Sequence, residues 1–382
     1  MVTRIKSDRI LTPQGVISGY VYFEGEYITY VGREELAYES EIDATGLYVS
    51  PGFIDIHTHG AVGVDYGSPE SVEEINRALA YQASRGATTI LPTVTSSSPD
   101  VTERALKMLS EAIDEGAPAN VPGIHLEGPF LSLKQAGAQD PELITEPRED
   151  FYMPLLERFG KYIVRWDYAP ERDGGHKFAR LLSERGILPS AAHTDAEHEH
   201  IKGALENGMR LITHLYSCTS TITRHGGFRH LGVIESAYLL DELYIELICD
   251  GKHLPPELLK LIFKLKPHGK IILCTDSLMV AGIDAKEARV GTTECIIEDG
   301  ICKLRDRSAF AGSIATADRL LWVATKEAEL SIPEAVKMLT ENPARLLNLN
   351  TGSLEEGKRA DILAFDENID IHRIFLGGRV VK

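Results

Sequence analysis

Residues 52–60, GFIDIHTHG, are the stretch that first indicates the fold. They form a short apolar, strand-like run that ends in a His-x-His pair, and a glycine follows directly. Because alternate residues of a strand share one face, the imidazoles of His57 and His59 are expected to point the same way. The sequence therefore predicts a buried strand with two histidines at its carboxyl end.

Seven further runs of this kind follow, and stretches with helix-forming composition come after most of them. The runs are TTILPTVTS (88–96), VPGIHLEG (121–128), YIVRWDYAP (162–170), LPSAAHTD (188–195), MRLITHLYS (209–217), YIELICDGKH (244–253) and IILCTDS (271–277). The helix-like stretches are 71–86, 101–116, 178–186, 196–208 and 255–266.

Eight strands alternating with helices over about 220 residues are typical of a (β/α)8 TIM-like barrel, a fold of about 250 residues. A doubly wound open sheet is the alternative. Its glycine-rich phosphate fingerprint does not follow the first run, where the sequence reads HTHGAVG. We therefore predict an α/β protein built on a barrel.

The two ends of the chain differ from the middle. Residues 1–50 and 352–382 alternate apolar and polar residues and are broken by glycine, a pattern typical of short antiparallel strands. We expect both ends to form one small β-sandwich domain, and residues 51–351 to form the barrel.

Composition excludes several classes of protein. Of 382 residues, 43% are hydrophobic and 25% are charged, as in ordinary globular proteins. A net charge of −17 disfavours binding to nucleic acid or to anionic membranes. Five cysteines without a CxxC pair, and a start without an apolar signal region, lead us to expect a cytoplasmic protein with reduced thiols.

Residues with metal-binding chemistry fall at the ends of the predicted strands, which meet at one mouth in a closed barrel. The candidate metal ligands are His57, His59, Glu127, His193 and His214. Four imidazoles and a carboxylate suit Zn²⁺ or Fe²⁺ better than Ca²⁺ or Mg²⁺. Each histidine alone could be a hydrogen-bonded structural residue, and His198 and His200 are expected to be solvated at the start of a helix.

Asp276 closes the eighth run and is a candidate for acid/base catalysis. A carboxylate beside a cation stays ionised and can accept a proton from water whose pKa the metal lowers. The alternative is an aspartate that only forms a turn or caps a helix.

Together these residues carry a resemblance. PGFIDIHTHG (51–60), HLEGPF (125–130), AHTDA (192–196), THLYS (213–217), DGKH (250–253) and CTDS (274–277) resemble the motifs of the amidohydrolase superfamily. HLEGPF, DGKH and AGS (311–313) more specifically resemble the N-acetylglucosamine-6-phosphate deacetylases of that superfamily, and the similarity runs over nearly the whole chain.

The resemblance implies roles for these residues. Glu127, His193 and His214 would hold one divalent metal, and His57 and His59 a second one. Zn²⁺ is the expected metal, with Fe²⁺, Co²⁺ and Mn²⁺ as alternatives. Asp276 would be the general acid and base. The implied substrate contacts are Ala138, Gln139, Ser217, Cys218, His253, Phe310, Ala311, Gly312 and Ser313. The resemblance also implies a homodimer.

The sequence departs from the family pattern at the substrate end. Where many members have Asn-Ala-Met after the sixth run, this chain has Ser217, Cys218 and Thr219, and Gln139 stands where many have histidine. Residues 219–232, TSTITRHGGFRHLG, offer cations for a phosphate, of which Arg224 is the candidate. A solvated basic loop is the other interpretation of this segment.

Three functions follow as alternatives. The first is metal-dependent hydrolysis of an N-acetyl amino sugar 6-phosphate, with N-acetyl-D-glucosamine 6-phosphate as the expected substrate; a galactosamine-type or unphosphorylated sugar stays open. The second is another amidohydrolase reaction, on cyclic amides or N-acyl amino acids. The third is a non-catalytic barrel that serves as an assembly partner.

Overall fold

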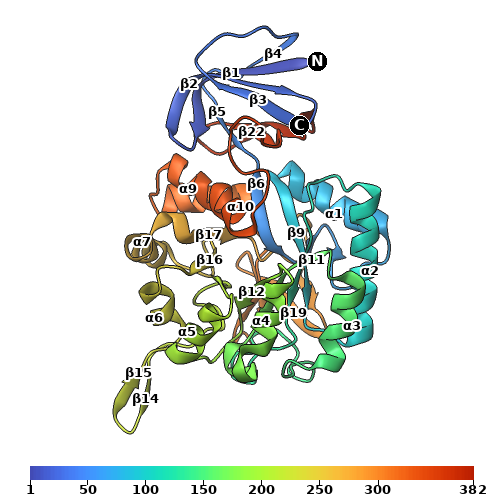
Figure 1. Ribbon diagram of the computed structural model, residues 1–382, viewed down its shortest axis with the longest axis vertical. Helices are drawn as coiled ribbons and strands as arrows, with labels where there is room; N and C mark the ends of the chain where they lie inside the picture. Colours follow the sequence, from blue (N-terminus) through green and yellow to red (C-terminus); the bar gives the residue numbers. More distant parts are fainter.

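The computed structural model describes residues 1–382, which form a barrel and a smaller β-domain stacked on one end of it (Figure 1). The two termini both lie in the β-domain. No helix in the structure combines the length and the hydrophobicity needed to cross a membrane.

The barrel consists of eight parallel strands with one strand from each predicted run. These are β6 (Phe53–Thr58), β9 (Ala87–Thr95), β10 (Ile124–Glu127), β11 (Ile163–Tyr168), β12 (Leu188–Ala191), β13 (Leu211–Ile212), β16 (Tyr244–Ile248) and β17 (Ile271–Cys274). They are paired in the order β17-β16-β13-β12-β11-β10-β9-β6. The first and last strands meet where the Asp276 N–H donates to the carbonyl of His57, at 2.9 Å. The predicted barrel is confirmed.

Helices cover the outside of the barrel (Figure 1). They are α1 (Val72–Ser84), α2 (Pro99–Glu115), α3 (Glu149–Phe159), α4 (Lys177–Glu184), α5 (His198–Glu206), α6 (Val233–Leu239), α7 (Pro256–Leu265), α8 (Ala317–Trp322), α9 (Ile332–Leu339) and α10 (Glu341–Leu347); a π-helical turn, Val323–Glu327, continues α8. The five helix-like stretches of the sequence correspond to α1, α2, α4, α5 and α7, with α2 and α4 beginning two residues and one residue earlier than predicted. At the start of α1, Ser71 accepts a hydrogen bond from the Glu74 N–H, an N-cap that its sequence favours.

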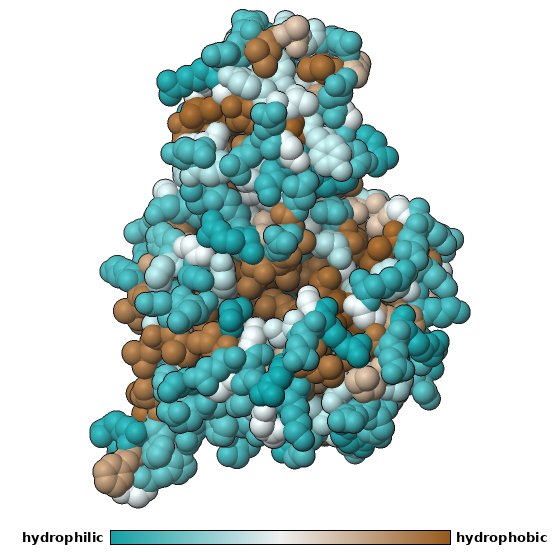
Figure 2. All heavy atoms as spheres, in the orientation of Figure 1, coloured by the Kyte–Doolittle hydropathy of each residue, from teal (hydrophilic) through white to brown (hydrophobic).

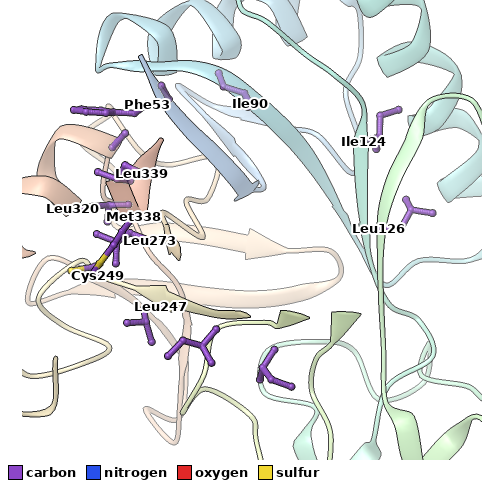
Figure 3. Packing of buried hydrophobic residues seen from close by; sticks show 14 of the residues in the cluster. Phe53, Ile90, Ile124, Leu126, Leu247, Cys249, Leu273, Leu320, Met338 and Leu339 are labelled. Carbon is purple, nitrogen blue, oxygen red and sulfur yellow. The ribbon is translucent and has the colours of Figure 1, made fainter. Parts of the chain in front are cut away.

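The main core lies between the strands and these helices and contains 68 buried residues. Figure 3 shows some of them. Phe53, Ile90 and Leu247 come from three different strands, and Leu320 and Met338 reach the same core from α8 and α9. Burying this apolar surface is the main favourable contribution to folding. It fixes the barrel, and therefore the positions of the strand ends.

The β-domain combines both ends of the chain. Its strands are β1 (Val2–Thr12), β2 (Gly15–Glu24), β3 (Tyr27–Gly32), β4 (Ser40–Asp43), β5 (Tyr48–Pro51), β22 (Ile362–Phe365), β23 (Ile371–Leu376) and β24 (Arg379–Val380). The order is β24-β23-β22-β5-β1-β2-β3, with β4 also on β1. Phe23 of β2 and Phe375 of β23, which are not sheet neighbours, pack at 5.5 Å between ring centroids. The sheet thus bends over its own core, as in a sandwich.

Two strand pairs and one four-stranded sheet, which the sequence pattern does not predict, are inserted between barrel elements. They are the pair β7 (Gly60–Ala61) and β8 (Val64–Asp65), the hairpin β14 (Thr223–His225) and β15 (Phe228–His230), and a four-stranded sheet of β18 (Glu287–Val290), β19 (Thr293–Glu298), β20 (Ile301–Leu304) and β21 (Phe310–Gly312). The hairpin projects from the barrel in Figure 1. The four-stranded sheet follows β17 in the chain. It therefore begins at the carboxyl ends of the barrel strands, where the candidate site residues lie.

Most of the surface in Figure 2 is hydrophilic. Hydrophobic side chains gather along the side of the barrel that carries α6 and α7, and at the tip of the hairpin. Leu239, Leu261 and Leu265 are the large exposed hydrophobic residues of these helices, and Phe228 of the hairpin is 77% exposed.

Candidate metal centre and active site

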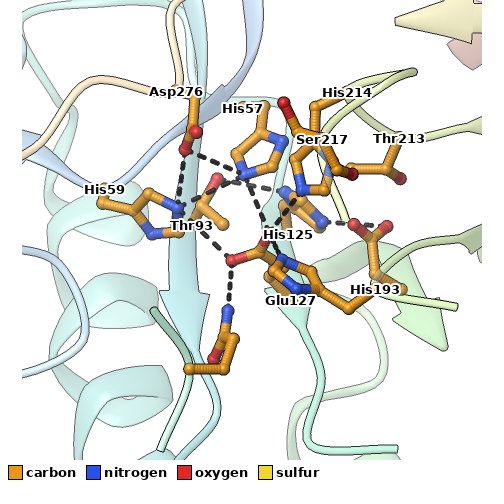
Figure 4. A network of polar contacts seen from close by, with 12 residues as sticks. His57, His59, Thr93, His125, Glu127, His193, Thr213, His214, Ser217 and Asp276 are labelled. Carbon is orange, nitrogen blue, oxygen red and sulfur yellow. Dashed lines mark hydrogen bonds and ion pairs between the residues drawn. The ribbon is translucent and has the colours of Figure 1, made fainter. Parts of the chain in front are cut away.

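The barrel brings a carboxylate and two imidazoles from three strand ends together. Glu127 ends β10, and His193 and His214 follow β12 and β13 (Figure 4). Oε1 of Glu127 lies 3.2 Å from Nε2 of His193 and 3.1 Å from Nε2 of His214. All three residues are buried. Their ligand atoms lie within 4.8 Å of one another, so one metal ion could contact all three.

A second group lies beside the first. His57 of β6 and His59, which directly follows that strand, face Asp276, which follows β17. Nε2 of His59 is 3.1 Å from Oδ1 of Asp276 and 3.3 Å from Nε2 of His57. Glu127 is shared between the groups, because one of its oxygens is 3.5 Å from His57 and the other 3.5 Å from His59.

Backbone conformation turns three of these side chains into the mouth. His193, His214 and Asp276 have φ of 42°, 29° and 47°, in the left-handed region that residues other than glycine seldom adopt. Such strained conformations persist where the surrounding structure holds them, often at functional sites. The loops after β12, β13 and β17 are therefore shaped to present these groups.

Hydrogen bonds on the far side of the rings fix which nitrogen faces the cluster. Nδ1 of His193 donates to the carbonyl of Gln135 at 2.8 Å, and Nδ1 of His214 to the carbonyl of Ser217 at 3.1 Å. Carbonyl oxygens only accept, so each Nδ1 carries a proton, and Nε2 is the nitrogen that a neutral ring would offer to a cation. This arrangement is typical of histidines that bind a metal, and the residues fit a divalent cation.

The ionisation of the two carboxylates, Glu127 and Asp276, also fits a site for a divalent cation. Burial alone would raise the pKa of Glu127, but the imidazoles of His57, His193 and His214 hold that pKa well below its usual value. Burial would likewise raise the pKa of Asp276, and the hydrogen bond from His59 lowers it. Both carboxyl groups are therefore ionised at neutral pH.

Four buried polar residues behind the cluster were missed by the sequence analysis. Arg165 of β11 donates to Glu246 of β16 at 2.5 Å and to Asp167 at 3.1 Å, inside the barrel. His125 of β10 lies 3.0 Å from Asp167, and burial, with the charge of Arg165, lowers the pKa of His125 to about 4. The sequence signal that could have identified these residues is the presence of charged side chains inside otherwise apolar strand runs.

A cavity of about 240 Å³ opens beside the cluster. Its lining includes most of the residues that the resemblance implies for substrate contact: Ala138, Gln139, Ser217, Cys218, His253, Phe310, Ala311 and Gly312. Ser313 is buried next to the cavity, and its N–H donates to the carbonyl of Asp276 at 2.9 Å.

Arg224 lies elsewhere. It is exposed on the hairpin β14–β15 and does not line the cavity. His198 and His200 are also outside the cluster: the former contacts Ser236 Oγ at 2.9 Å, and the latter is exposed on α5.

His253 is held by its own loop. Its Nδ1 lies 2.8 Å from Oδ2 of Asp250, whose other oxygen accepts the N–H groups of Lys252 and His253, both at 2.8 Å. The carboxylate therefore keeps the proton on Nδ1 and leaves Nε2 for the cavity.

This arrangement of strand-end ligands around one cavity agrees with the comparison to known proteins. The model of the Amidohydrolase family matches residues 48–381. The chain belongs to the amidohydrolase family. It is a hydrolase that acts on amide bonds, and the family is metal-dependent.

Individual relatives point to one activity within the family. The chain is 31% identical to N-acetylglucosamine-6-phosphate deacetylase of Bacillus subtilis (strain 168) over 96% of this chain and 94% of the relative. It is also 31% identical to the protein of that name from Lysinibacillus sphaericus, over 89% and 87% of the two chains.

The chain is also similar to solved structures of deacetylases of this name. The structure of N-acetylglucosamine-6-phosphate deacetylase from Thermotoga maritima has a TM-score of 0.87 and 29% identity, and covers 100% of this chain and 99% of that one. A mutant of the Mycobacterium smegmatis deacetylase in complex with N-acetyl-D-glucosamine-6-phosphate has a TM-score of 0.92 and 25% identity, over 100% of this chain and 99% of that one.

Proposed function

We propose that this amidohydrolase removes the acetyl group of N-acetyl-D-glucosamine 6-phosphate and releases acetate and D-glucosamine 6-phosphate. The observation that carries the proposal is the position of Asp276, 3.1 Å from His59 and beside the Glu127–His193–His214 group, at the edge of the cavity. Similarity to deacetylases of this name over most of the chain supports the choice of substrate.

The site residues have two roles: five of them would bind a cation, and Asp276 transfers a proton. Glu127, His193 and His214 would hold one divalent metal, and His57 and His59 a second, with Zn²⁺ favoured over Fe²⁺, Co²⁺ and Mn²⁺. A metal held there supplies Lewis-acid chemistry, which polarises a carbonyl and lowers the pKa of water. Asp276, ionised at neutral pH, accepts a proton from the attacking water at its carboxylate and returns it to the departing amine nitrogen.

The cavity is suited to a small polar substrate. His253 presents Nε2 to it, and the β21 residues Phe310, Ala311 and Gly312 form a wall. Arg224 is our candidate for the phosphate. Because it lies outside the cavity of its own chain, that role requires the hairpin of a second copy to reach the cavity, in the homodimer that we propose.

Acetate release tests the function directly. The purified protein, with its metal content measured, is assayed with the N-acetyl forms of glucosamine 6-phosphate, galactosamine 6-phosphate and both unphosphorylated sugars. The glucosamine 6-phosphate derivative should give the highest kcat/KM. A preference for another sugar would reassign the substrate. Turnover of hydantoins or N-acyl amino acids alone would favour a different amidohydrolase reaction, and no turnover with metal bound would favour a non-catalytic barrel.

We place this reaction in the cytoplasm, because all five cysteines are free thiols, as is usual in that compartment. Fractionation of the source cells, with activity measured in each fraction, tests the location. Activity confined to a membrane or secreted fraction would contradict it.

A further inference from the structure

Gln139 makes two hydrogen bonds that fix the orientation of its side-chain amide. Its Oε1 accepts the backbone N–H of Ser96 at 3.1 Å, and its Nε2 donates to Oε2 of Glu127 at 2.7 Å. The backbone N–H can only donate and the ionised carboxylate can only accept, so the amide cannot be reversed without losing both bonds. Gln139 is 5% exposed, which protects both bonds from competing water.

The bond to Glu127 occupies one carboxylate oxygen and directs the other. With Oε2 held by Gln139, Oε1 is the oxygen that lies 3.2 Å from His193 and 3.1 Å from His214. Without this donor, Oε2 would keep only His59, at 3.5 Å, and the carboxylate could turn more easily about its terminal bond. The orientation of Glu127 toward the two histidines therefore depends on a residue that is not itself in the ligand group.

The same segment also positions His193. The carbonyl of Gln135, four residues before Gln139, accepts the proton of His193 Nδ1 at 2.8 Å. The Ser132 N–H donates to the carbonyl of His193 at 2.8 Å. Residues 132–139 thus contact two of the three members of the Glu127–His193–His214 group.

The segment is itself packed tightly. Gly137 has φ +59°, and a Cβ there would lie 2.5 Å from Sγ of Cys218 and 3.4 Å from the His193 ring. After Gln139, Asp140 accepts a hydrogen bond from Thr292 in the turn between β18 and β19. The segment is therefore held at both ends and has little freedom to move away from the cluster.

We propose that Gln139 is a positioning residue for Glu127, and that its main effect is on how tightly the Glu127–His193–His214 group retains a divalent cation rather than on substrate affinity. Hydrogen bonds of this kind, from a neighbour to a metal-binding side chain, typically change metal affinity about 10–100-fold. The inference rests on the proposed function only where KM for the substrate is measured.

The test measures metal retention without substrate. Wild type, Gln139→Met and Gln139→Glu are loaded with Zn²⁺, and transfer of the ion to a colorimetric chelator is followed. Methionine has a similar shape but no donor, and should weaken Zn²⁺ binding by about 10–100-fold. Glutamate replaces the donor with a second carboxylate, which repels Glu127 instead of holding it, so Zn²⁺ binding should again be weaker than in wild type.

Gln14→Met is the matched control. It makes the same substitution at an exposed glutamine in the turn between β1 and β2, which belongs to the β-domain and not to the segment around the cluster. Its Zn²⁺ affinity should equal that of wild type. Thermal unfolding of the metal-free proteins shows whether each variant is folded; should Gln139→Met not fold, Gln139→Glu carries the comparison with Gln14→Met.

Two outcomes would overturn the inference. One is wild-type Zn²⁺ affinity in both folded Gln139 variants. The other is a raised KM with unchanged Zn²⁺ retention, which would make Gln139 a substrate contact. Failure of the proposed function gives a different result: wild type would retain Zn²⁺ and release no acetate.

Discussion

Nδ1 of His57 donates a hydrogen bond of 2.9 Å to Oε1 of Glu246, across the interior of the barrel. The two residues belong to β6 and β16, which are not neighbours, because β17 lies between them. Arg165 binds the other oxygen of Glu246 at 2.5 Å. Burial would raise the pKa of Glu246, but Arg165 and His57 hold it well below its usual value. A buried ionic network thus supports one of the candidate metal ligands from behind.

Glu246→Gln should weaken this support. Arg165 loses one of its two carboxylate partners inside the barrel, and breaking a buried ion pair costs about 3–5 kcal/mol. Chemical denaturation of the metal-free protein should show this loss, while Glu257→Gln, on the exposed start of α7, should change the free energy of unfolding by less than about 0.5 kcal/mol. Equal stability of the two variants would show that Asp167 alone satisfies Arg165.

Asp276→Asn should strongly lower kcat and leave the metal in place. Asparagine tolerates the left-handed backbone at this position, where φ is 47°, so the loop should keep its shape. It cannot accept the proton, and loss of such a group costs about 10²–10⁴-fold in kcat. Steady-state kinetics and metal analysis of the same sample check this. Turnover within a factor of three of wild type would remove Asp276 from the mechanism.

Removal of the metal should lower the thermal stability. A cation that binds only the folded chain stabilises it by mass action, by about 4 kcal/mol at 1,000 times its Kd. The unfolding temperature of chelator-treated protein should therefore rise with added Zn²⁺, as measured by calorimetry. His193→Ala combined with His214→Ala should largely remove this response; an undiminished response would place the stabilising cation elsewhere.

Asp250→Asn should act on substrate binding through His253. The asparagine side chain can donate as well as accept, so it no longer keeps the proton on Nδ1 of His253. If His253 contacts the bound sugar phosphate, KM should rise about tenfold, with a smaller change in kcat. His253→Gln should show the same pattern. A fall in kcat without a change in KM would assign the pair to the chemical step instead.

Much of the fold was predictable because its signals are local. Each barrel strand is a short apolar run, and five of the helices follow such runs with good helix-forming composition. The four-stranded sheet β18–β21 was missed because its strands are short and partly exposed, so residues 287–312 lack the clear apolar pattern of the barrel strands.

The site was only partly predictable. His57, His59, Glu127, His193, His214 and Asp276 were selected because they stand at the ends of apolar runs, and the barrel brings all six together. Gln139 was linked to the substrate by resemblance, and its bond to Glu127 could not be read from the sequence. Arg224 is a candidate because an arginine can give a phosphate two donors, and the structure places it on an exposed hairpin away from the cavity of its own chain.

The sequence alone determined which residues end the strands, since strand formation depends on short runs of neighbouring residues and parallel strands in a barrel share one direction. Only the tertiary structure decided which side chains meet across the barrel, such as His57 with Glu246, or over its mouth, such as Gln139 with Glu127. Those contacts depend on how strands and loops far apart in the chain pack together. No local pattern of residues encodes that geometry.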